Sequence, residues 1–485
     1  MDQFAELPIY RDLIFLTPEL LMAVGGMALL MVGAFRGDRA ANAIGGLALI
    51  LLTATGVLIA VQQGERELIF NGSFVADPFA RFVKILVLTG AGLVIVISHD
   101  FLTRERILRM EFPVLIIFAT LGMMMMVSAN DLIALYVGLE LQSLCLYVLA
   151  AFNRDSRRST EAGLKYFVLS SLASGMLLYG ASLIYGFTGT VNFDQLANTL
   201  SGATPSVGII FGLVFLAAGL AFKISAVPFH MWTPDVYEGA PTPVTAFFAS
   251  APKIAAMALF LRAFLWPFPE LTEEWRQIIV FIAIMSMGWG AFAAIGQTNI
   301  KRLMGYSAIG HMGYALMGLA AGGVEGVRAV LMYLLIYLGM TIGTFVCILS
   351  MRRREGMVEQ ISDLSGLSRT HPFRAAVLGA LMFSLAGIPP LAGFFAKFYV
   401  FMAALKAGLV PLAIIGVVAS VVAAFYYLRI VKVMYFDEPA PAFEPAMPAG
   451  MRVVMTASGA FVMGFIFFIG PLVAAAGWAA QSLIR

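Results

Sequence analysis

Residues 207–228 of the chain read VGIIFGLVFLAAGLAFKISAVP. Most of this stretch is apolar, over about the twenty residues that an α-helix needs to cross the hydrocarbon core of a bilayer. Lys223 and Pro228 stand near its end, and a proline inside a helix removes a backbone donor and clashes with the preceding turn. The stretch therefore predicts a membrane-spanning helix that opens locally beside a lysine.

Similar apolar stretches recur along the whole chain. Of its 485 residues, 61% are hydrophobic and 12% are charged, and the mean hydropathy is +0.91, which is outside the usual range of soluble proteins. A helix can satisfy its own backbone where the bilayer offers no water. The composition predicts an all-α polytopic membrane protein with about fourteen spans. The predicted spans are 13–35, 41–62, 78–98, 111–129, 131–152, 161–188, 207–229, 242–265, 275–296, 300–320, 326–351, 374–400, 409–436 and 451–478.

A second interrupted helix is predicted at residues 386–393, AGIPPLAG. Two groups of five helices, residues 111–265 and 275–436, place the two interruptions at matching fourth positions. Because five is odd, the second group enters the membrane from the opposite side, the inverted-repeat pattern of transporters; a chance scatter of prolines is the alternative. Since the connections are too short to fold separately, residues 1–485 are predicted to form one membrane domain, flanked by helices in 1–98 and 451–485.

The distribution of Lys and Arg predicts the orientation. Assigned to alternate connections, more than twice as many fall on one side as on the other, among them Arg352 to Arg354. Cytoplasmic connections carry this excess, so both termini are predicted to be periplasmic. The first residues include the acidic Asp2 and Glu6 and no basic n-region, which indicates no removable signal peptide.

Four ionisable residues stand out inside the predicted spans: Glu140, Lys223, Lys253 and Lys397. Each costs about 2.5 to 3.5 kcal/mol at a helix centre and needs a compensating role. A buried lysine holds its proton weakly, and a nearby carboxylate strengthens that hold, so moving the carboxylate switches the lysine between binding and releasing a proton. The alternative is a static salt bridge that fixes helix packing.

Small and polar side chains accompany these groups at helical spacing, and such lines hold the water that a proton path requires. His311 belongs to one line, either as a relay group or as a packed hydrogen-bonding residue. The three lines are Tyr136, Glu140, Ser143 and Tyr147; Thr242, Thr245, Ala249 and Lys253; and Ser307, His311 and Tyr314.

Other polar residues receive structural interpretations. Glu19, Lys84 and Lys165 lie near predicted helix ends, so snorkelling or surface pairing is expected, with Lys165 paired to Glu161. Cys145 and Cys347 fall in apolar segments and are expected to pack there. The sequence has no metal-ligand cluster, nucleotide-binding motif or basic patch with interleaved aromatics, so no metal, cofactor or nucleic acid is predicted to bind this chain.

Three stretches carry a family resemblance. Residues 228–246, PFHMWTPDVYEGAPTPVTA, followed by SAPK at 250–253, resemble the signature of the antiporter-like subunits of respiratory complex I and of multisubunit cation/proton antiporters. This variant is most similar to the subunit N branch, the homologues of mitochondrial subunit 2. Residues 301–313, KRLMGYSAIGHMG, and 387–397, GIPPLAGFFAK, agree with it.

The resemblance implies a proton-translocating subunit of NADH:quinone oxidoreductase in the bacterial inner membrane. It matches Glu140, Lys223, Lys253 and Lys397 to the family's functional positions on helices five, seven, eight and twelve. It also implies that flavin, iron–sulfur clusters, NADH and the quinone headgroup bind partner subunits, while membrane lipids, water and protons contact this one. Two alternatives are a subunit of a cation/proton antiporter and a structural scaffold without transport.

Overall fold

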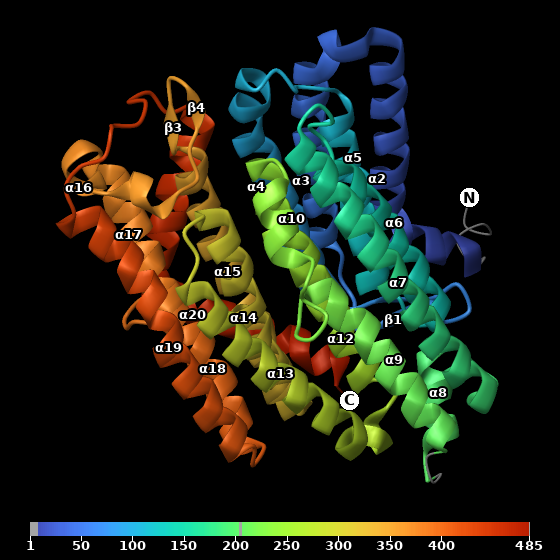
Figure 1. Cartoon of the computed structure of the whole chain (residues 1–485). Coiled ribbons are helices and arrows are strands. Elements are labelled where there is room, and N and C mark those ends of the chain that lie inside the picture. The colour runs from blue at the N-terminus through green and yellow to red at the C-terminus, as the bar shows by residue number, and fades with distance from the viewer. Residues whose placement is uncertain (1–7, 203–205, 485) are drawn as a thin grey trace.

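The computed structural model describes residues 8–202 and 206–484, and the predictions that rest on Asp2, Glu6, the Arg11 side chain or Arg485 lie outside this described part. The described chain is nearly all helical (Figure 1). Ten of its segments are long and apolar enough to cross a membrane. The longer helices are α2 (Pro8–Arg36), α3 (Ala41–Val61), α4 (Pro78–Arg104), α5 (Glu111–Val127), α6 (Leu132–Ala150), α7 (Arg157–Thr188), α9 (Val207–Ile224), α12 (Ala251–Leu265), α13 (Thr272–Ile295), α14 (Ile300–Ala321), α15 (Gly323–Leu349), α17 (Pro372–Ala386), α18 (Ala392–Lys406), α19 (Val410–Phe436) and α20 (Ala449–Leu483). The shorter elements are α8 (Phe193–Leu200), α10 (Thr233–Gly239), α11 (Thr242–Ala249), α16 (Leu367–Thr370) and two hairpins, β1 (Glu67–Ile69) with β2 (Phe74–Ala76) and β3 (Arg352–Arg353) with β4 (Gly356–Met357).

Capping side chains begin several of the helices. The Asp131 carboxylate accepts hydrogen bonds from the backbone N–H groups of Ile133 at 2.8 Å and Ala134 at 2.6 Å, and α6 starts there. Asn299 caps α14 in the same way. These side chains satisfy N–H groups that have no partner inside the helix. Both helices therefore begin close to where the sequence predicts.

The two predicted interruptions are present. Helix α9 ends at Ile224, and Ser225 adopts a left-handed conformation with φ of 65° before the chain turns into α10. Helix α17 ends at Ala386, Gly387 has φ of 91°, and α18 begins at Ala392. Each break frees backbone carbonyl groups inside the bundle.

A third break was not predicted. Residues 242–265 are predicted as one helix, but the structure divides them at Ser250 into α11 and α12. Pro252 stands two residues later, and a proline ring has no N–H and clashes with the carbonyl four residues before it. The single-helix prediction is wrong at this point. As a result, Lys253 lies in the first turn of α12 rather than in the middle of a continuous helix.

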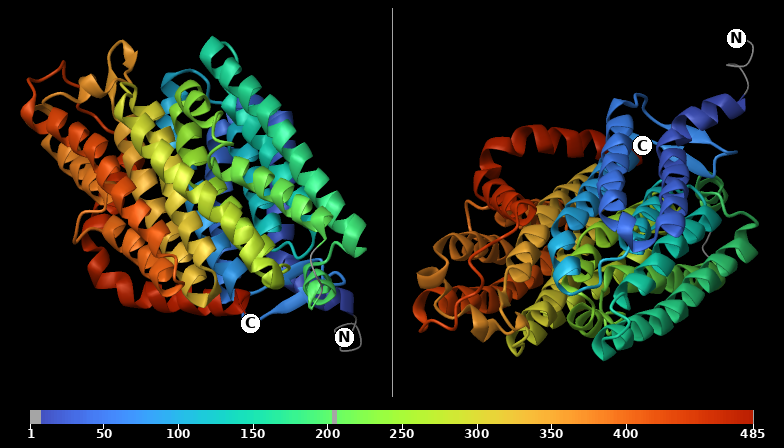
Figure 2. Two further views of the ribbon diagram at one scale, coloured as in Figure 1. Left: turned by 60° about the horizontal axis from the view of Figure 1, so that its bottom comes forward. Right: turned by 90° about the horizontal axis from the view of Figure 1, so that it is seen from above.

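The described ends of the chain meet at one side of the bundle (Figure 2). The Asp12 carboxylate of α2 accepts a hydrogen bond from the Phe70 backbone at 3.0 Å. The Ser482 hydroxyl of α20 accepts one from the Phe79 backbone, also at 3.0 Å. Phe70 lies in the turn of the β1–β2 hairpin and Phe79 lies in the first turn of α4, which follows it. Helix α2 therefore begins and α20 ends next to the same connection.

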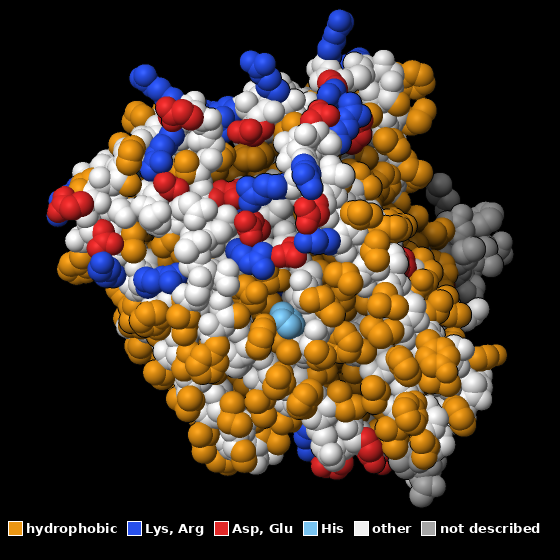
Figure 3. Space-filling view, viewed as in Figure 1, with side chains coloured by type: hydrophobic (Ala, Val, Ile, Leu, Met, Phe, Trp, Pro, Cys, Tyr) orange, Lys and Arg blue, Asp and Glu red, His pale blue; other side chains and the backbone are white. Residues whose placement is uncertain are grey.

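Charged side chains gather at one end of the bundle, and a broad apolar surface lies below them (Figure 3). The β3–β4 hairpin belongs to the charged end (Figure 1). Large apolar side chains remain exposed in the middle of long helices, for example Leu172 at 65% in α7, Val421 at 70% in α19 and Phe467 at 83% in α20. Such a surface suits lipid or the apolar face of a partner.

Candidate proton-relay site

Lys223, in the last turn of α9, lies in a shell of hydroxyl groups. Its ammonium donates to the Oγ atoms of Ser143 and Ser170 at 2.8 Å each and of Ser174 at 3.3 Å. Glu140 Oε1 is 3.8 Å from the ammonium, and the Ser174 hydroxyl donates to that same oxygen. The two residues singled out from the sequence therefore lie together, with a serine bridging them.

Only some side chains of the polar line predicted on α6 contact the hydroxyl groups around Lys223. Ser143 is fully buried in it, and the Tyr147 hydroxyl donates to Ser170 Oγ at 2.7 Å. Tyr136 is half-buried and makes no hydrogen bond to the shell among the described residues. The Glu140 side chain remains 23% exposed, whereas that of Lys223 is 2% exposed. Glu140 thus connects a buried ammonium to the outer face of the bundle.

Lys253 occupies the interruption of α9. Its ammonium donates to the Ile224 carbonyl at 3.1 Å and to Ser225 Oγ at 2.7 Å. It also lies 5.9 Å from the ring centroid of Trp232 and 5.7 Å from that of Tyr237. The carboxyl end of a helix carries partial negative charge, which attracts a cation. Lys253 therefore has a helix end, a hydroxyl and two aromatic faces around it.

Lys397 has the same kind of surroundings at the other interruption. Its ammonium donates to the carbonyl of Ala386, the last residue of α17, at 2.9 Å and to Ser420 Oγ at 2.7 Å. The ring centroid of Tyr314 is 5.1 Å away. Within residues 12–202 and 206–484, neither Lys253 nor Lys397 forms an ion pair with a carboxylate.

His311 is buried among tyrosines. Its Nδ1 lies 2.6 Å from the Tyr333 hydroxyl and its Nε2 lies 3.1 Å from the Tyr427 hydroxyl. The Tyr427 hydroxyl is also 2.5 Å from Ser307 Oγ. Both ring nitrogens thus have a hydroxyl partner, which can donate to one tautomer and accept from the other.

The structure divides the five predicted site residues into three groups. Glu140 and Lys223 form one, and Lys253 forms the second. His311 and Lys397 form the third, because they line the same small cavity. No side-chain hydrogen bond among the described residues joins Lys253 to Lys223 or to His311. A proton that crosses these gaps needs water or a side-chain movement.

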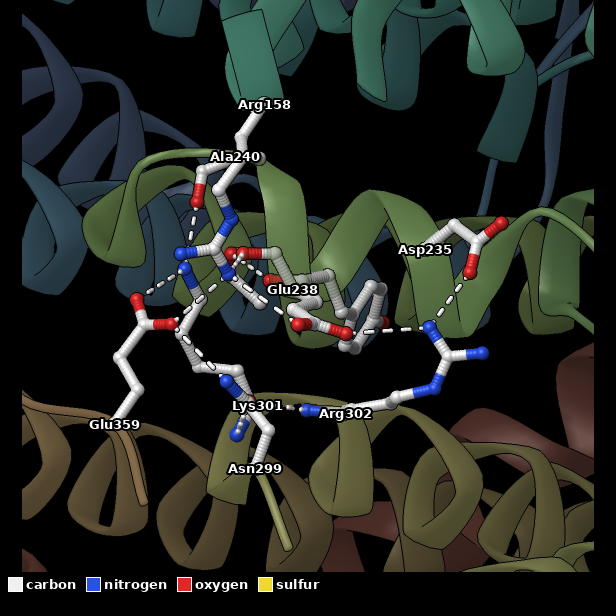
Figure 4. A network of polar contacts seen from close by, with 10 residues as sticks. Arg158, Asp235, Glu238, Ala240, Asn299, Lys301, Arg302 and Glu359 are labelled. Carbon is white, nitrogen blue, oxygen red and sulfur yellow. Dashed lines mark hydrogen bonds and ion pairs between the residues drawn. The ribbon is translucent and has the colours of Figure 1, made fainter. Parts of the chain in front are cut away.

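A network of charged residues covers the end of the bundle beside α10 (Figure 4). Lys301 donates to Glu359 at 3.0 Å and to the Ala240 carbonyl at 2.8 Å. Arg158 lies 3.2 Å from Glu359, and Arg302 lies 2.6 Å from Asp235. The network joins the start of α7, the start of α14 and the segment after β4.

A polar cavity of about 570 Å³ opens at this network, and Thr242 of α11 lines it together with Lys301 and Glu359. Burial raises the pKa of Glu359, but the ammonium of Lys301, with Asn299 and Arg158, outweighs burial and holds that pKa below its ordinary value. Thr245, one turn further along α11, donates to the Tyr237 carbonyl at 2.9 Å. The predicted line on the eighth helix therefore starts at this cavity.

Arg262 and Asp77 form an ion pair that the sequence analysis missed. Their side chains are 3% and 0% exposed, and the charged atoms are 2.9 Å apart. Asp77 also accepts from the Ala80 backbone at 2.7 Å, and thereby caps α4. The available signal was Arg262 itself, because it falls inside the predicted span 242–265 without a charged neighbour in sequence.

Glu19 and Lys84 correct another expectation. The two residues pair with each other at 2.6 Å, with side chains only 4% and 6% exposed. Snorkelling or surface pairing is therefore wrong for them, because α2 and α4 bring both side chains inside the bundle. Lys165 agrees with its expected pairing to Glu161, at 2.8 Å, and also pairs with Asp235 at 3.0 Å.

The two cysteines lie apart from each other. Cys145 and Cys347 are both buried and free, and they lie on different helices. Among residues 8–202 and 206–484, no cluster of three or more His, Cys, Asp or Glu residues is placed to hold a metal ion.

Comparisons with known proteins identify the family of this chain. Residues 129–423 match the family described as NADH:quinone oxidoreductase/Mrp antiporter, TM. The chain is 62% identical over 467 residues to NADH-quinone oxidoreductase subunit N of Parvibaculum lavamentivorans, covering 96% of this chain and 97% of that relative. A chain of respiratory complex I from Thermus thermophilus with bound Aureothin is similar with a TM-score of 0.81 and 32% identity, covering 95% and 99%. A chain of the Mrp complex from Dietzia sp. DQ12-45-1b has a TM-score of 0.78 at 24% identity, covering 100% and 98%, a likeness of fold alone.

Proposed function

Because this chain belongs to the NADH:quinone oxidoreductase/Mrp antiporter membrane family, we propose that it translocates protons as subunit N of a bacterial NADH:quinone oxidoreductase. It acts as a membrane subunit of that multisubunit translocase and carries no redox centre of its own. NADH oxidation and quinone reduction take place in other subunits, where we also place the flavin and the iron–sulfur clusters.

The hydroxyl groups around the buried lysines carry the relay proposal. A serine hydroxyl can accept from an ammonium, and after rotation it can donate to the neutral amine. Lys223, Lys253 and Lys397 each have at least one such hydroxyl within 2.8 Å. Their surroundings therefore tolerate both protonation states, as a relay requires. A structural salt bridge would instead place a carboxylate in direct contact.

Glu140 is the proposed control of this relay. Two unit charges about 4 Å apart interact by about 4 kcal/mol at an effective dielectric constant of about 20. Moving one proton against 100 mV costs about 2.3 kcal/mol. Displacing Glu140 from its position 3.8 Å from Lys223 can therefore supply the work of one step. Its partial exposure leaves room for a partner subunit to move it.

We propose that the chain crosses the membrane fourteen times, with two inverted five-helix repeats and both termini in the periplasm. Each of the fourteen predicted ranges overlaps a helix or a divided helix. The described ends share one side of the bundle, which an even number of spans requires. At each interruption a lysine donates to the carbonyl of the last helical residue: Lys253 to Ile224 and Lys397 to Ala386.

Two other functions make different predictions. A cation/proton antiporter subunit would purify in an assembly without flavin or iron–sulfur proteins, whereas subunit N purifies in an NADH-oxidising complex. A scaffold gains nothing from buried Lys253 and Lys397, which form no ion pair among the described residues, since each costs insertion energy.

The test replaces Lys253 with Ala and with Arg in the assembled complex. NADH-driven acidification of inverted membrane vesicles is measured beside NADH oxidation by an artificial acceptor, which reports assembly. Both variants should assemble and lose pumping, because guanidinium does not release its proton. Lys432→Arg, an exposed lysine paired with Asp437, serves as the control and should pump normally. Wild-type pumping by Lys253→Arg refutes the relay.

A further inference from the structure

A groove of about 630 Å³ is lined by residues of α5, α6 and α7 and of the segments beside them. Figure 1 shows the course of these three helices. None of the five predicted site residues lines the groove, although Tyr147 does. Its walls include Val148, Leu164 and Phe167, which are 53%, 62% and 47% exposed. Its rim includes Arg109 and Arg154, from the segments that precede α5 and follow α6. The groove thus combines apolar walls with a basic mouth.

The charges at the mouth favour an anion. Arg154 is exposed and has no ion-pair partner among the described residues. Arg109 pairs with Asp38 but keeps half of its side chain exposed, so it can still turn toward a bound group. Glu111 is the acidic residue at the rim. Basic pockets between membrane helices at the cytoplasmic side suit anionic lipid headgroups, and the excess of Lys and Arg assigns this end to the cytoplasm.

The floor of the groove reaches the relay. Tyr147 lines it, and its ring packs edge-on against Phe167 at 5.5 Å between centroids. The Tyr147 hydroxyl donates to Ser170 Oγ at 2.7 Å, and Ser170 accepts from Lys223 at 2.8 Å. An acyl chain in the groove would therefore lie two hydrogen bonds from the Lys223 ammonium.

We propose that this groove binds one anionic phospholipid, with its phosphate at Arg154 and Arg109 and an acyl chain along Val148 and Leu164. The bound lipid keeps bulk water out of the gap beside α6 and fixes Tyr147 against Ser170. A neutral quinone would leave Arg154 without a counter-charge, and a soluble anion would leave the apolar walls uncovered. The effect on pumping rests on the proposed relay function, whereas lipid binding itself does not.

The first experiment places a photoreactive side chain in the groove. Val148→benzoylphenylalanine is introduced into the full complex, which is irradiated in native membranes and analysed by mass spectrometry. An adduct with an anionic phospholipid is expected, and Arg154→Gln should reduce its yield several-fold. Arg157→Gln removes an exposed arginine outside the groove and should leave the yield unchanged. A cross-link to a neighbouring polypeptide, or no adduct at all, overturns the proposal.

The second experiment measures the consequence for pumping. The complex is depleted of lipid and reconstituted into phosphatidylcholine vesicles with increasing phosphatidylglycerol. Arg154→Gln should need several-fold more phosphatidylglycerol for half-maximal pumping, whereas Arg157→Gln should match the wild type. Equal shifts in both variants would indicate a general charge effect and refute the site. If Lys223→Ala pumps normally while the lipid adduct persists, the relay fails and the lipid site stands.

Discussion

The Lys223 ammonium and the Glu140 carboxylate are 3.8 Å apart, and the Ser174 hydroxyl touches both of them. The pair is therefore held by an intermediate group rather than by direct contact. Such a group can follow either charge when the other moves, because a hydroxyl both donates and accepts.

Ser174→Ala should reduce the rate of proton pumping about tenfold without loss of assembly. The change removes one of the three hydroxyl acceptors of the buried Lys223 ammonium, which costs about 1 to 3 kcal/mol. A barrier that is higher by about 1.4 kcal/mol slows a reaction about tenfold. Pumping is measured in inverted vesicles. Ser171→Ala is the matched control, since the Ser171 hydroxyl is exposed and donates to its own helix at Phe167. Equal rates for both variants would show that the bridge is dispensable.

Lys397→Arg should abolish pumping while the complex still assembles. The guanidinium retains its proton, so the relay stops at the second interruption. Lys406→Arg lies in the same helix, is exposed and pairs with Glu325, so it should retain normal pumping. Pumping by Lys397→Arg at the control rate would exclude Lys397 as a relay group.

Asp77→Ala should destabilise the protein by about 3 to 5 kcal/mol, because it leaves the Arg262 charge buried and unpaired. It also removes the cap of α4. The expected result is a lower midpoint of thermal denaturation and less assembled complex in the membrane. Glu325→Gln weakens two partly exposed pairs, with Arg328 and with Lys406, and should change the midpoint little. Similar midpoints for the two variants would contradict the assigned role of the buried pair.

Glu359 should stabilise the charged end throughout the range from pH 5 to pH 8. Its folded pKa lies below the ordinary value of 4.5, so its contribution is fully present above that value and is lost only as the pH falls through the folded pKa. The difference in thermal midpoint between wild type and Glu359→Gln should therefore be constant over this range. Glu355→Gln, at the same cavity, is the control and should show no such difference. A gap that closes between pH 5 and pH 6 would mean that the carboxyl titrates there.

The β3–β4 hairpin should face the cytoplasm. A cysteine introduced by Arg354→Cys should react with a membrane-impermeant maleimide in inverted vesicles but not in intact spheroplasts. Lys406→Cys, at the opposite end of the bundle, should show the reverse pattern. Because Cys145 and Cys347 are buried, their background labelling should be low. Labelling of Arg354→Cys from the periplasmic side would reverse the proposed orientation.

The positions of the helices and their two proline-linked interruptions were predictable from the sequence. An apolar run of sufficient length must form a helix in the bilayer, since its backbone has no other partners there. A proline inside such a helix removes one backbone hydrogen bond and favours a break, although α2 and α20 continue through Pro18 and Pro471. Pro252 accounts for the break at Ser250 in the same way. This break was not predicted, because the residues on both sides of it are apolar and resemble one continuous helix.

The sequence by itself determined that Glu140, Lys223, Lys253 and Lys397 fall in apolar helical segments, because the composition of each segment can be read without knowing its neighbours. Only the tertiary structure decided what surrounds them. Ser143 meets Lys223 across 80 residues of chain, and Asp77 meets Arg262 across 185. Such partners depend on which helix faces pack together. The periodicity of a sequence shows which face of one helix is apolar, but it does not show which other helix packs against that face. The burial of Glu19 with Lys84 has the same cause, since depth along a helix does not tell which neighbour covers it.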